Sequence, residues 1–360
     1  MQDVWLEVAL NGSGGREAQP LAPVTVAAVI DEAMACLGEG ASILHYHAYD
    51  AAGRHAERNL DFHRAVLEGV RARTEAVIYP TTAMRRLGQP PMPVEERYRI
   101  ERTLAAEGLL DVFVLDPGSC NFAREGTAGQ GFVYLNPPEE TASGFALARE
   151  TGLIPAMAIY ELGFARAAQA MAAEAGVAAG HALHRVMFSD RYLWGAPPSA
   201  AGLAAVGQAM ALIGVRRWML AGIDFDVFAV MGAGLELGAD VRVGLEDAPR
   251  GSEMGNAAQV ARARAEIAAS GRGLASPEAV RRDLAARRAA PGGVSGGRAD
   301  LPAKRVGAKG PPPTARFVQA VAPKPIRARC GGVRRLVQAA RHGLPPRAAV
   351  PAVPQGLGVA

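Results

Sequence analysis

The most constraining feature of this 360-residue sequence is a regular alternation of short apolar runs with segments of helical periodicity. The apolar runs predict strands at residues 4–10, 42–48, 76–79, 111–115, 153–160, 183–188, 218–223 and 241–244. The periodic segments predict helices at residues 24–37, 59–73, 94–107, 142–150, 162–175, 200–213, 226–237 and 256–270. Strands that alternate with helices of about 10–15 residues pair in parallel. Eight such units predict an α/β fold of the (β/α)8 TIM barrel type, with a doubly wound sheet as the alternative.

One insertion interrupts the alternation. Residues 121–136 lie between the fourth predicted strand and its helix, and we expect them to form a hairpin or flap. It would cover the C-terminal mouth of the barrel, where the active sites of this fold are found.

Charge and composition divide the chain near residue 285. Residues 286–360 contain 14 lysines and arginines against one acid, Asp300, whereas residues 1–285 contain no lysine and more acids than arginines. The tail is also rich in proline and glycine, so we predict a catalytic barrel at 1–285 and a disordered basic tail at 286–360. We interpret the tail as a solvated extension without its own function; an arm that holds nucleic acid is the alternative.

Several protein classes are excluded by what the sequence lacks. Three cysteines cannot form a disulfide framework, which indicates a reducing, cytoplasmic location, and no apolar run reaches the roughly 18 residues of a membrane span. Without a lysine, the barrel cannot be a Schiff-base aldolase or a pyridoxal-phosphate enzyme. Residues 12–15 form a glycine-rich loop that matches no nucleotide-binding motif. An enzyme that acts on carbon–carbon bonds without an amine would need a metal.

The second predicted strand ends in a pair of histidines, His45 and His47. Residues i and i+2 of a strand share a face, so both imidazoles point the same way, about 6–7 Å apart. Two imidazoles and a carboxylate form a zinc site with an open position; the alternative is two mouth-lining histidines bonded to the backbone. We interpret the other barrel histidines as structural, His181 and His184, or as surface residues, His55 and His63.

A carboxylate pair, Glu246 and Asp247, follows the last predicted strand. In a closed barrel the second and eighth strands both flank the first, so their ends lie about 10 Å apart. One of the two acids can then face the ion bound by His45 and His47 while the other serves as a base. The alternative is that both acids merely cap the next helix.

Several segments match, in order and spacing, the motifs of a known family: residues 8–12, 20–25, 40–47, 241–247 and 275–279, with Asn256. Over about residues 2–285 the chain resembles the β-keto acid cleavage enzymes, whose best-described type acts on 3-keto-5-aminohexanoate. The resemblance implies a zinc-bearing (β/α)8 barrel, one Zn²⁺ per chain, that condenses a β-keto acid with acetyl-CoA to give acetoacetate and a new acyl-CoA. It also implies a homo-oligomer, with no membrane or nucleic-acid partner.

The resemblance further assigns roles to individual residues. The zinc ligands would be His45, His47 and Glu246. Asp247 would be the base that removes a proton from the acetyl-CoA methyl group, and Arg242 would assist it, because a permanent positive charge favours an ionised carboxylate. The substrate would be bound by Thr81, Asn11 and Gly12.

The chain departs from the family pattern at four positions. Tyr49 replaces an arginine that commonly follows the histidine pair, and Gly14 or a gap replaces a glutamate. Val114 stands for a threonine and Ala158 for a second glutamate. Acids at these positions suit a substrate ammonium group, so their loss predicts a β-keto acid without that amine: neutral, apolar or differently charged.

Other functions remain as alternatives. A metal-dependent hydrolase or another metal-dependent C–C lyase could use the same barrel. Amidohydrolase-like barrels carry their histidine pair after the first strand and commonly use a lysine, and both features are missing here. A non-catalytic scaffold is the third alternative.

Overall fold

The computed structural model describes residues 2–84, 92–178 and 181–289, and it forms a ring of eight parallel strands. The neighbour order is β3-β2-β1-β10-β9-β8-β7-β4, and β3 and β4 lie side by side and close the ring without a hydrogen-bonded ladder. This confirms the predicted (β/α)8 barrel. The strands are β1 Leu6–Ala9, β2 Ile43–Tyr46, β3 Val77–Pro80, β4 Val112–Val114, β7 Ile154–Ile159, β8 Leu183–Phe188, β9 Met219–Gly222 and β10 Asp240–Val243.

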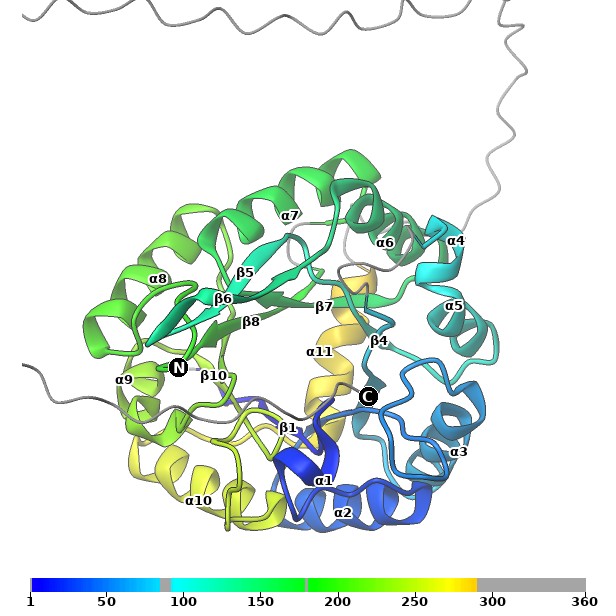
Figure 1. Cartoon of the computed structure of the whole chain (residues 1–360), viewed down its shortest axis with the longest axis horizontal. Helices are drawn as coiled ribbons and strands as arrows, with labels where there is room; N and C mark the ends of the chain where they lie inside the picture. Colours follow the sequence, from blue (N-terminus) through cyan, green and yellow to red (C-terminus); the bar gives the residue numbers. More distant parts are fainter. Residues whose placement is uncertain (1, 85–91, 179–180, 290–360) are drawn as a thin grey trace, which may run out of the picture. The chain divides into compact units, whose positions relative to one another are not determined.

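Helices surround the strands, as Figure 1 shows. They cover the outer faces of strands that are buried almost throughout, as expected when a parallel sheet is covered on both sides. The helices are α1 Gly15–Ala18, α2 Val26–Glu39, α3 Leu60–Arg71, α4 Val94–Arg97, α5 Arg99–Ala106, α6 Pro138–Thr151, α7 Leu162–Ala175, α8 Ala200–Leu212, η1 Val227–Ala229, α9 Met231–Glu236, α10 Asn256–Ala269 and α11 Pro277–Ala289. In the part of the chain that is described, no helix has the length and apolar character needed to cross a membrane.

The helices differ from the predicted ones in a few places. The segment 94–107 is divided into α4 and α5, and 226–237 is divided into η1 and α9. α1 and α11 were not predicted. The beginning of α11 is nevertheless encoded locally, because the hydroxyl of Ser276 accepts a hydrogen bond from the backbone N–H of Ala279 and Pro277 occupies the first helical position. α11 continues past the predicted boundary at 285, and the predicted tail from 290 onward lies outside the described residues.

The predicted insertion forms an antiparallel hairpin of β5, Cys120–Arg124, and β6, Thr127–Tyr134. In Figure 1 the hairpin lies across the opening of the strand ring. Phe122 fixes it there through ring contacts with side chains from the barrel, Tyr160, Tyr192 and Trp194. The hairpin therefore covers the mouth of the barrel with aromatic side chains.

The opposite end of the barrel is covered by α11. The side chain of Arg281 donates hydrogen bonds to the carbonyls of Glu75 and Ala76, just before β3, and to the carboxylate of Asp111, just before β4. Arg287 reaches the carbonyl of Ala182, just before β8. The helix thus bridges the N-terminal ends of strands from different parts of the ring.

Candidate metal centre

The two histidines of the β2 end lie together inside the mouth, as the strand periodicity predicts. Their ring centroids are 5.3 Å apart, and both side chains are buried. His45 pairs with Ala9 of β1 and with Tyr79 of β3. The backbone N–H of His47 donates a 2.8 Å hydrogen bond to the side chain of Asn11, which fixes the residue just beyond the strand.

Two glycines allow Glu246 to reach these histidines. Gly244 has φ +131°, and a Cβ there would lie 2.2 Å from the carbonyl oxygen of Ala9. Gly12 has φ +64°, and a Cβ there would lie 2.9 Å from Cγ of Glu246. Both positions combine a backbone conformation that favours glycine with a contact that only glycine permits. The ends of β10 and β1 can therefore come close enough for Glu246 to extend over β2.

The three side chains converge as a metal-ligand set would. Nε2 of His45 is 3.4 Å from Oε2 of Glu246, and Nε2 of His47 is 3.3 Å from Oε1. One donor atom from each residue lies within 4.8 Å of the other two. Within the described ranges, Oε2 of Glu246 and Nδ1 of His45 are buried without a hydrogen-bond partner.

The charge states also suit a divalent cation. Burial holds the pKa of His45 well below its usual range, which keeps a lone pair available for a metal. For Glu246, burial favours the neutral acid, but the charge of Arg242 opposes it and holds the pKa well below the usual range. Neutral imidazoles with an ionised carboxylate are the donors of many zinc sites. The residues therefore fit the metal.

Arg242 connects the metal ligands to two further carboxylates. Its guanidinium donates two hydrogen bonds of 2.8 Å to Asp247 and one of 2.9 Å to Glu7, and it lies 3.1 Å from Glu246. Glu7 also accepts a 2.7 Å hydrogen bond from the hydroxyl of Tyr79. Burial raises the pKa of Asp247, although Arg242 opposes the rise. Arg242 lines the cavity above the metal ligands, whereas Asp247 lies behind it.

A cavity of about 300 Å³ lies between the metal ligands and the hairpin. We call its wall from the ends of β2 and β10 the metal side; it carries His45, His47, Arg242 and Glu246. We call the opposite wall, from β4, β7, β8 and the hairpin, the arm side; it carries Val114, Asp116, Phe122, Phe132, Tyr134, Ala158, Tyr160, Arg185 and Met187. The arm side is thus mostly apolar and aromatic, with one buried ionic pair.

That pair, Arg185 and Asp116, is loosely joined. Their closest atoms are 3.9 Å apart, and Arg185 donates a 3.1 Å hydrogen bond to the carbonyl of Ala156 while its buried Nε has no partner among the described residues. Asp116 is bonded elsewhere, to the hydroxyl of Tyr134 and the N–H of Ala158. The guanidinium of Arg185 therefore keeps donors that neighbouring protein groups do not use.

The two threonines after β3 both line the cavity but differ in their partners. The hydroxyl of Thr82 lies 2.6 Å from the carboxyl of Glu101 and 3.0 Å from the carbonyl of Val114. Since a hydroxyl has one proton, both contacts are hydrogen bonds only when Glu101 is protonated. Burial raises the pKa of Glu101 to about 7, which agrees with this arrangement. Thr81, in contrast, has no side-chain hydrogen bond within the described residues and is available to a substrate.

Asn11 and Gly12, the other two residues predicted to bind the substrate, do not line this cavity. The amide of Asn11 donates to the carbonyls of Pro23 and His47 and accepts from the His47 backbone. Gly12 accepts a hydrogen bond from the hydroxyl of Tyr49. In this structure both residues position the metal ligands.

The interpretation as a surface residue is wrong for His63, whereas His55 is half-buried. His63 is fully buried and contacts the hydroxyl of Tyr46 and the carbonyl of Glu57, and burial lowers its pKa to about 4. Nε2 of His55 lies 2.8 Å from Nδ1 of His47. The sequence gives no periodicity in this loop, so only the fold could reveal these contacts.

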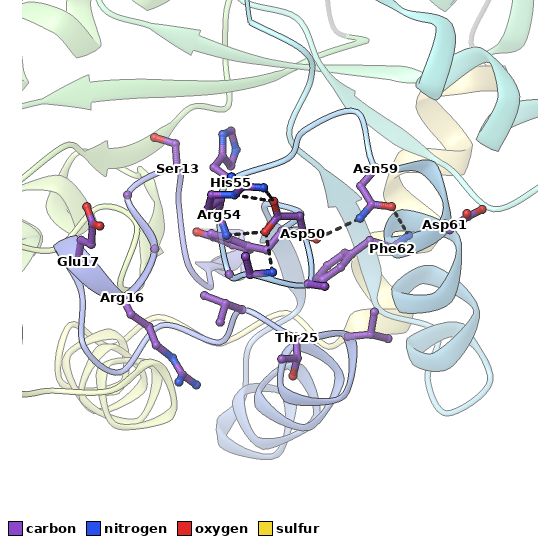
Figure 2. Close-up of a pocket in the computed structure, with 18 residues that line it drawn as sticks. Ser13, Arg16, Glu17, Thr25, Asp50, Arg54, His55, Asn59, Asp61 and Phe62 are labelled. Atoms are coloured by element: carbon purple, nitrogen blue, oxygen red, sulfur yellow. Dashed lines mark hydrogen bonds and ion pairs between the residues drawn. The ribbon is translucent and has the colours of Figure 1, made fainter. Parts of the chain in front are cut away.

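His55 also lies in the wall of a second cavity, a groove of about 950 Å³ outside the metal centre. Figure 2 shows this groove between Ser13 in the loop after β1, Arg16 in α1, the start of α2 at Thr25, and the start of α3 at Asp61. Ser13 lines both the groove and the cavity above the metal ligands. His55 therefore separates the metal centre from an open surface.

Fold and site together define a (β/α)8 barrel with a candidate metal centre at its mouth. A profile of the beta-keto acid cleavage enzyme family matches residues 3–285. The chain belongs to the beta-keto acid cleavage enzyme family.

Individual relatives are more distant. The chain is 24% identical over 233 residues to a 3-keto-5-aminohexanoate cleavage enzyme of Fusobacterium nucleatum, which covers 64% of this chain and 77% of the relative. It is 35% identical over 103 residues to a 3,5-dioxohexanoate:acetyl-CoA acetone transferase of Paraburkholderia graminis, covering 29% of this chain and 31% of that protein. The solved structure of ObcA with oxaloacetate shares the fold, with a TM-score of 0.56 and 18% identity, over 74% of this chain and 67% of that one.

Proposed function

We propose that this chain is a zinc-dependent enzyme that converts a β-keto acid and acetyl-CoA into acetoacetate and a new acyl-CoA. The observation that carries the proposal is the convergence of His45, His47 and Glu246 at the mouth of a family barrel. The names of the two relatives, a keto acid cleavage enzyme and an acetyl-CoA-dependent transferase, agree with it.

The atom balance of this reaction identifies the carbon that reacts. Acetoacetate joins the acetyl group of acetyl-CoA to the two-carbon acid end of the β-keto acid. The α carbon of the β-keto acid must therefore lose a proton and attack the thioester carbonyl, expelling the CoA thiolate. The thiolate then attacks the keto carbon, the bond from this carbon to the α carbon breaks, and the acetoacetate carbanion takes up a proton. We accordingly place proton removal at the α carbon, not at the acetyl methyl group expected from the sequence.

The chain's own groups would share these tasks. A bound zinc ion supplies a Lewis acid that withdraws electron density from the keto group. Asp247 is the proposed base, because burial raises its pKa and so strengthens it as a base. Arg242 stays protonated; it bonds the Asp247 carboxylate, lines the cavity, and would hold Asp247 in place and attract the carboxylate of the substrate. The free hydroxyl of Thr81 is the proposed donor to a substrate oxygen.

The arm side supports a substrate without an ammonium group. Val114 and Ala158, where the family pattern has polar or acidic residues, line the cavity and have apolar side chains. The buried guanidinium of Arg185 lies in the same wall and would repel a second cation. We therefore propose a neutral, apolar or anionic β-keto acid as the substrate.

The test is metal analysis of the purified protein followed by an acetoacetate assay with a panel of β-keto acids, each with and without acetyl-CoA. We expect one zinc ion per chain, turnover only with acetyl-CoA, and weak activity on a 5-amino substrate relative to its deaminated analogue. Turnover without acetyl-CoA would show a hydrolase or a simple lyase instead. A strict preference for the aminated substrate would contradict the proposed substrate class.

A further inference from the structure

We infer that His55 and Glu57 form a positioning pair, which orients the imidazole of His47 so that its Nε2 faces the metal. The contacts run in one line outward from the metal centre. Nε2 of His47 faces Glu246, Nδ1 of His47 lies 2.8 Å from Nε2 of His55, and Nδ1 of His55 lies 3.2 Å from Oε2 of Glu57. The inference rests on the proposed zinc centre and adds two residues that the family resemblance did not assign.

The positions of the protons follow from this line. A metal takes the lone pair of Nε2 of His47, so the proton of the neutral ring must be on Nδ1. That N–H donates to Nε2 of His55, which leaves the proton of a neutral His55 on Nδ1, 3.2 Å from the carboxylate of Glu57, whose negative charge favours a proton there. The pair therefore favours the one tautomer of His47 that can bind the metal through Nε2.

The surrounding loop holds this positioning pair in place. Tyr49 and His55 pair across an antiparallel bridge, and the N–H of Ala56 donates a 2.8 Å hydrogen bond to the carbonyl of Ala48. On the other side, the carbonyl of Glu57 is 2.9 Å from Nε2 of the buried His63. A rigid loop keeps His55 aligned with His47 before any metal arrives.

His45 provides an internal comparison. Its Nδ1 is buried and lacks a hydrogen-bond partner in the described ranges, so nothing there selects a tautomer. Hydrogen-bond partners of metal-bound histidines orient the ring and raise the basicity of the ligand, and their loss typically weakens metal binding by about 10–100-fold. The positioning pair therefore gives the ring of His47 a partner that the ring of His45 does not have within the described ranges.

The experiment measures zinc affinity on the full chain without substrates, by competition with a chromophoric chelator. We compare His55→Leu, which removes the acceptor, with His55→Gln, whose side-chain oxygen can replace Nε2 as an acceptor. We expect the dissociation constant for zinc to rise about 10–100-fold in His55→Leu, and only a few-fold in His55→Gln and Glu57→Gln. Glu17→Gln, at the groove rim, is the matched control and should bind zinc like the wild type.

Two further measurements separate positioning from folding. Nitrogen-15 NMR of the histidine rings should show His47 protonated at Nδ1 in the wild type and a mixture of tautomers in His55→Leu. The melting temperature of the metal-free variants should match the wild type. Equal zinc affinity in His55→Leu and the wild type would overturn the inference, as would equal loss in the Leu and Gln variants with a lowered melting temperature. Because no substrate is present, a failure of the proposed reaction leaves this result unaffected.

Discussion

Two buried arginines on opposite walls of the cavity differ in how completely the protein bonds them. On the metal side, Arg242 is held by Asp247 and Glu7 through hydrogen bonds of 2.8–2.9 Å. On the arm side, Arg185 donates one hydrogen bond among the described residues, to the carbonyl of Ala156, and lies 3.9 Å from the carboxylate of Asp116. The comparison shows that the protein fixes Arg242 before a substrate binds, whereas Arg185 retains unused donors. The fixed Arg242 suits a chemical step that is the same for every substrate, and Arg185, with its unused donors, suits selection among substrates.

The largest effect is expected on the metal side. Glu246→Gln removes the only charged ligand of the proposed centre, so we expect the bound zinc to be lost and kcat/KM to fall by at least about 10³-fold. Metal analysis and the acetoacetate assay measure both. Glu236→Gln, an exposed residue of α9, is the control. Full activity in a zinc-free Glu246→Gln protein would disprove the metal centre.

The next prediction compares the two arginines directly through the free energy of unfolding. Arg242→Met leaves the carboxylates of Glu7 and Asp247 buried without their cation, which should cost about 3–5 kcal/mol. Arg185→Met should cost less, about 1 kcal/mol, because Asp116 keeps its bonds to Tyr134 and Ala158. Urea denaturation of both variants tests this. Equal losses of unfolding free energy in the two variants would show that the protein bonds both arginines equally well.

A third prediction uses the buried acid behind the arm side, Glu101. Its pKa is raised to about 7 in the folded protein from an ordinary value near 4.5, so its contribution to stability is complete below about pH 4.5 and is lost as the pH rises through 7. Glu101→Gln has no ionisable group at this position, so this loss of stability at high pH does not occur in the variant. The variant should match the wild type near pH 4.5 and exceed it by roughly 3 kcal/mol at pH 9. Denaturant melts at both pH values measure the difference, and a pH-independent difference would refute the assignment.

The smallest predicted effect concerns substrate choice. Arg185→Met removes the cation of the arm side, so the preference for a deaminated over an aminated β-keto acid should fall about 10-fold in kcat/KM. Arg124→Met, on the exposed edge of the hairpin, should leave the preference unchanged. An unchanged ratio in Arg185→Met would mean that other residues exclude the amine.

The parts predicted correctly depend on short-range patterns. The barrel follows from eight repeats of strand and helix, and the shared face of His45 and His47 follows from the period of a strand. Closure of the ring then brings Glu246 near them, although it is almost 200 residues away in the chain. The start of α11 at Ser276 and Pro277 is also encoded locally, although no helix was predicted there.

The parts that were missed depend on contacts that no local sequence pattern shows. His55 and Glu57 lie in an irregular loop, and nothing local shows that the loop turns back on the β2 end. Glu7 interrupts an apolar run, but its partners Arg242 and Tyr79 come from other strands. The amide of Asn11 was expected to contact the substrate, and only the packed structure shows that backbone groups already occupy it.

The position of α11 has a consequence for the order of events in the reaction. Its arginines bond the strand beginnings at 75–76, 111 and 182, so in the described part of the chain α11 closes this end of the barrel and the cavity is reached from the opposite end, which the hairpin partly covers. In the proposed reaction, two reactants and two products would then share one route. Whichever molecule sits deeper has to arrive first and depart last, and a late-leaving product will compete with the next early-arriving reactant.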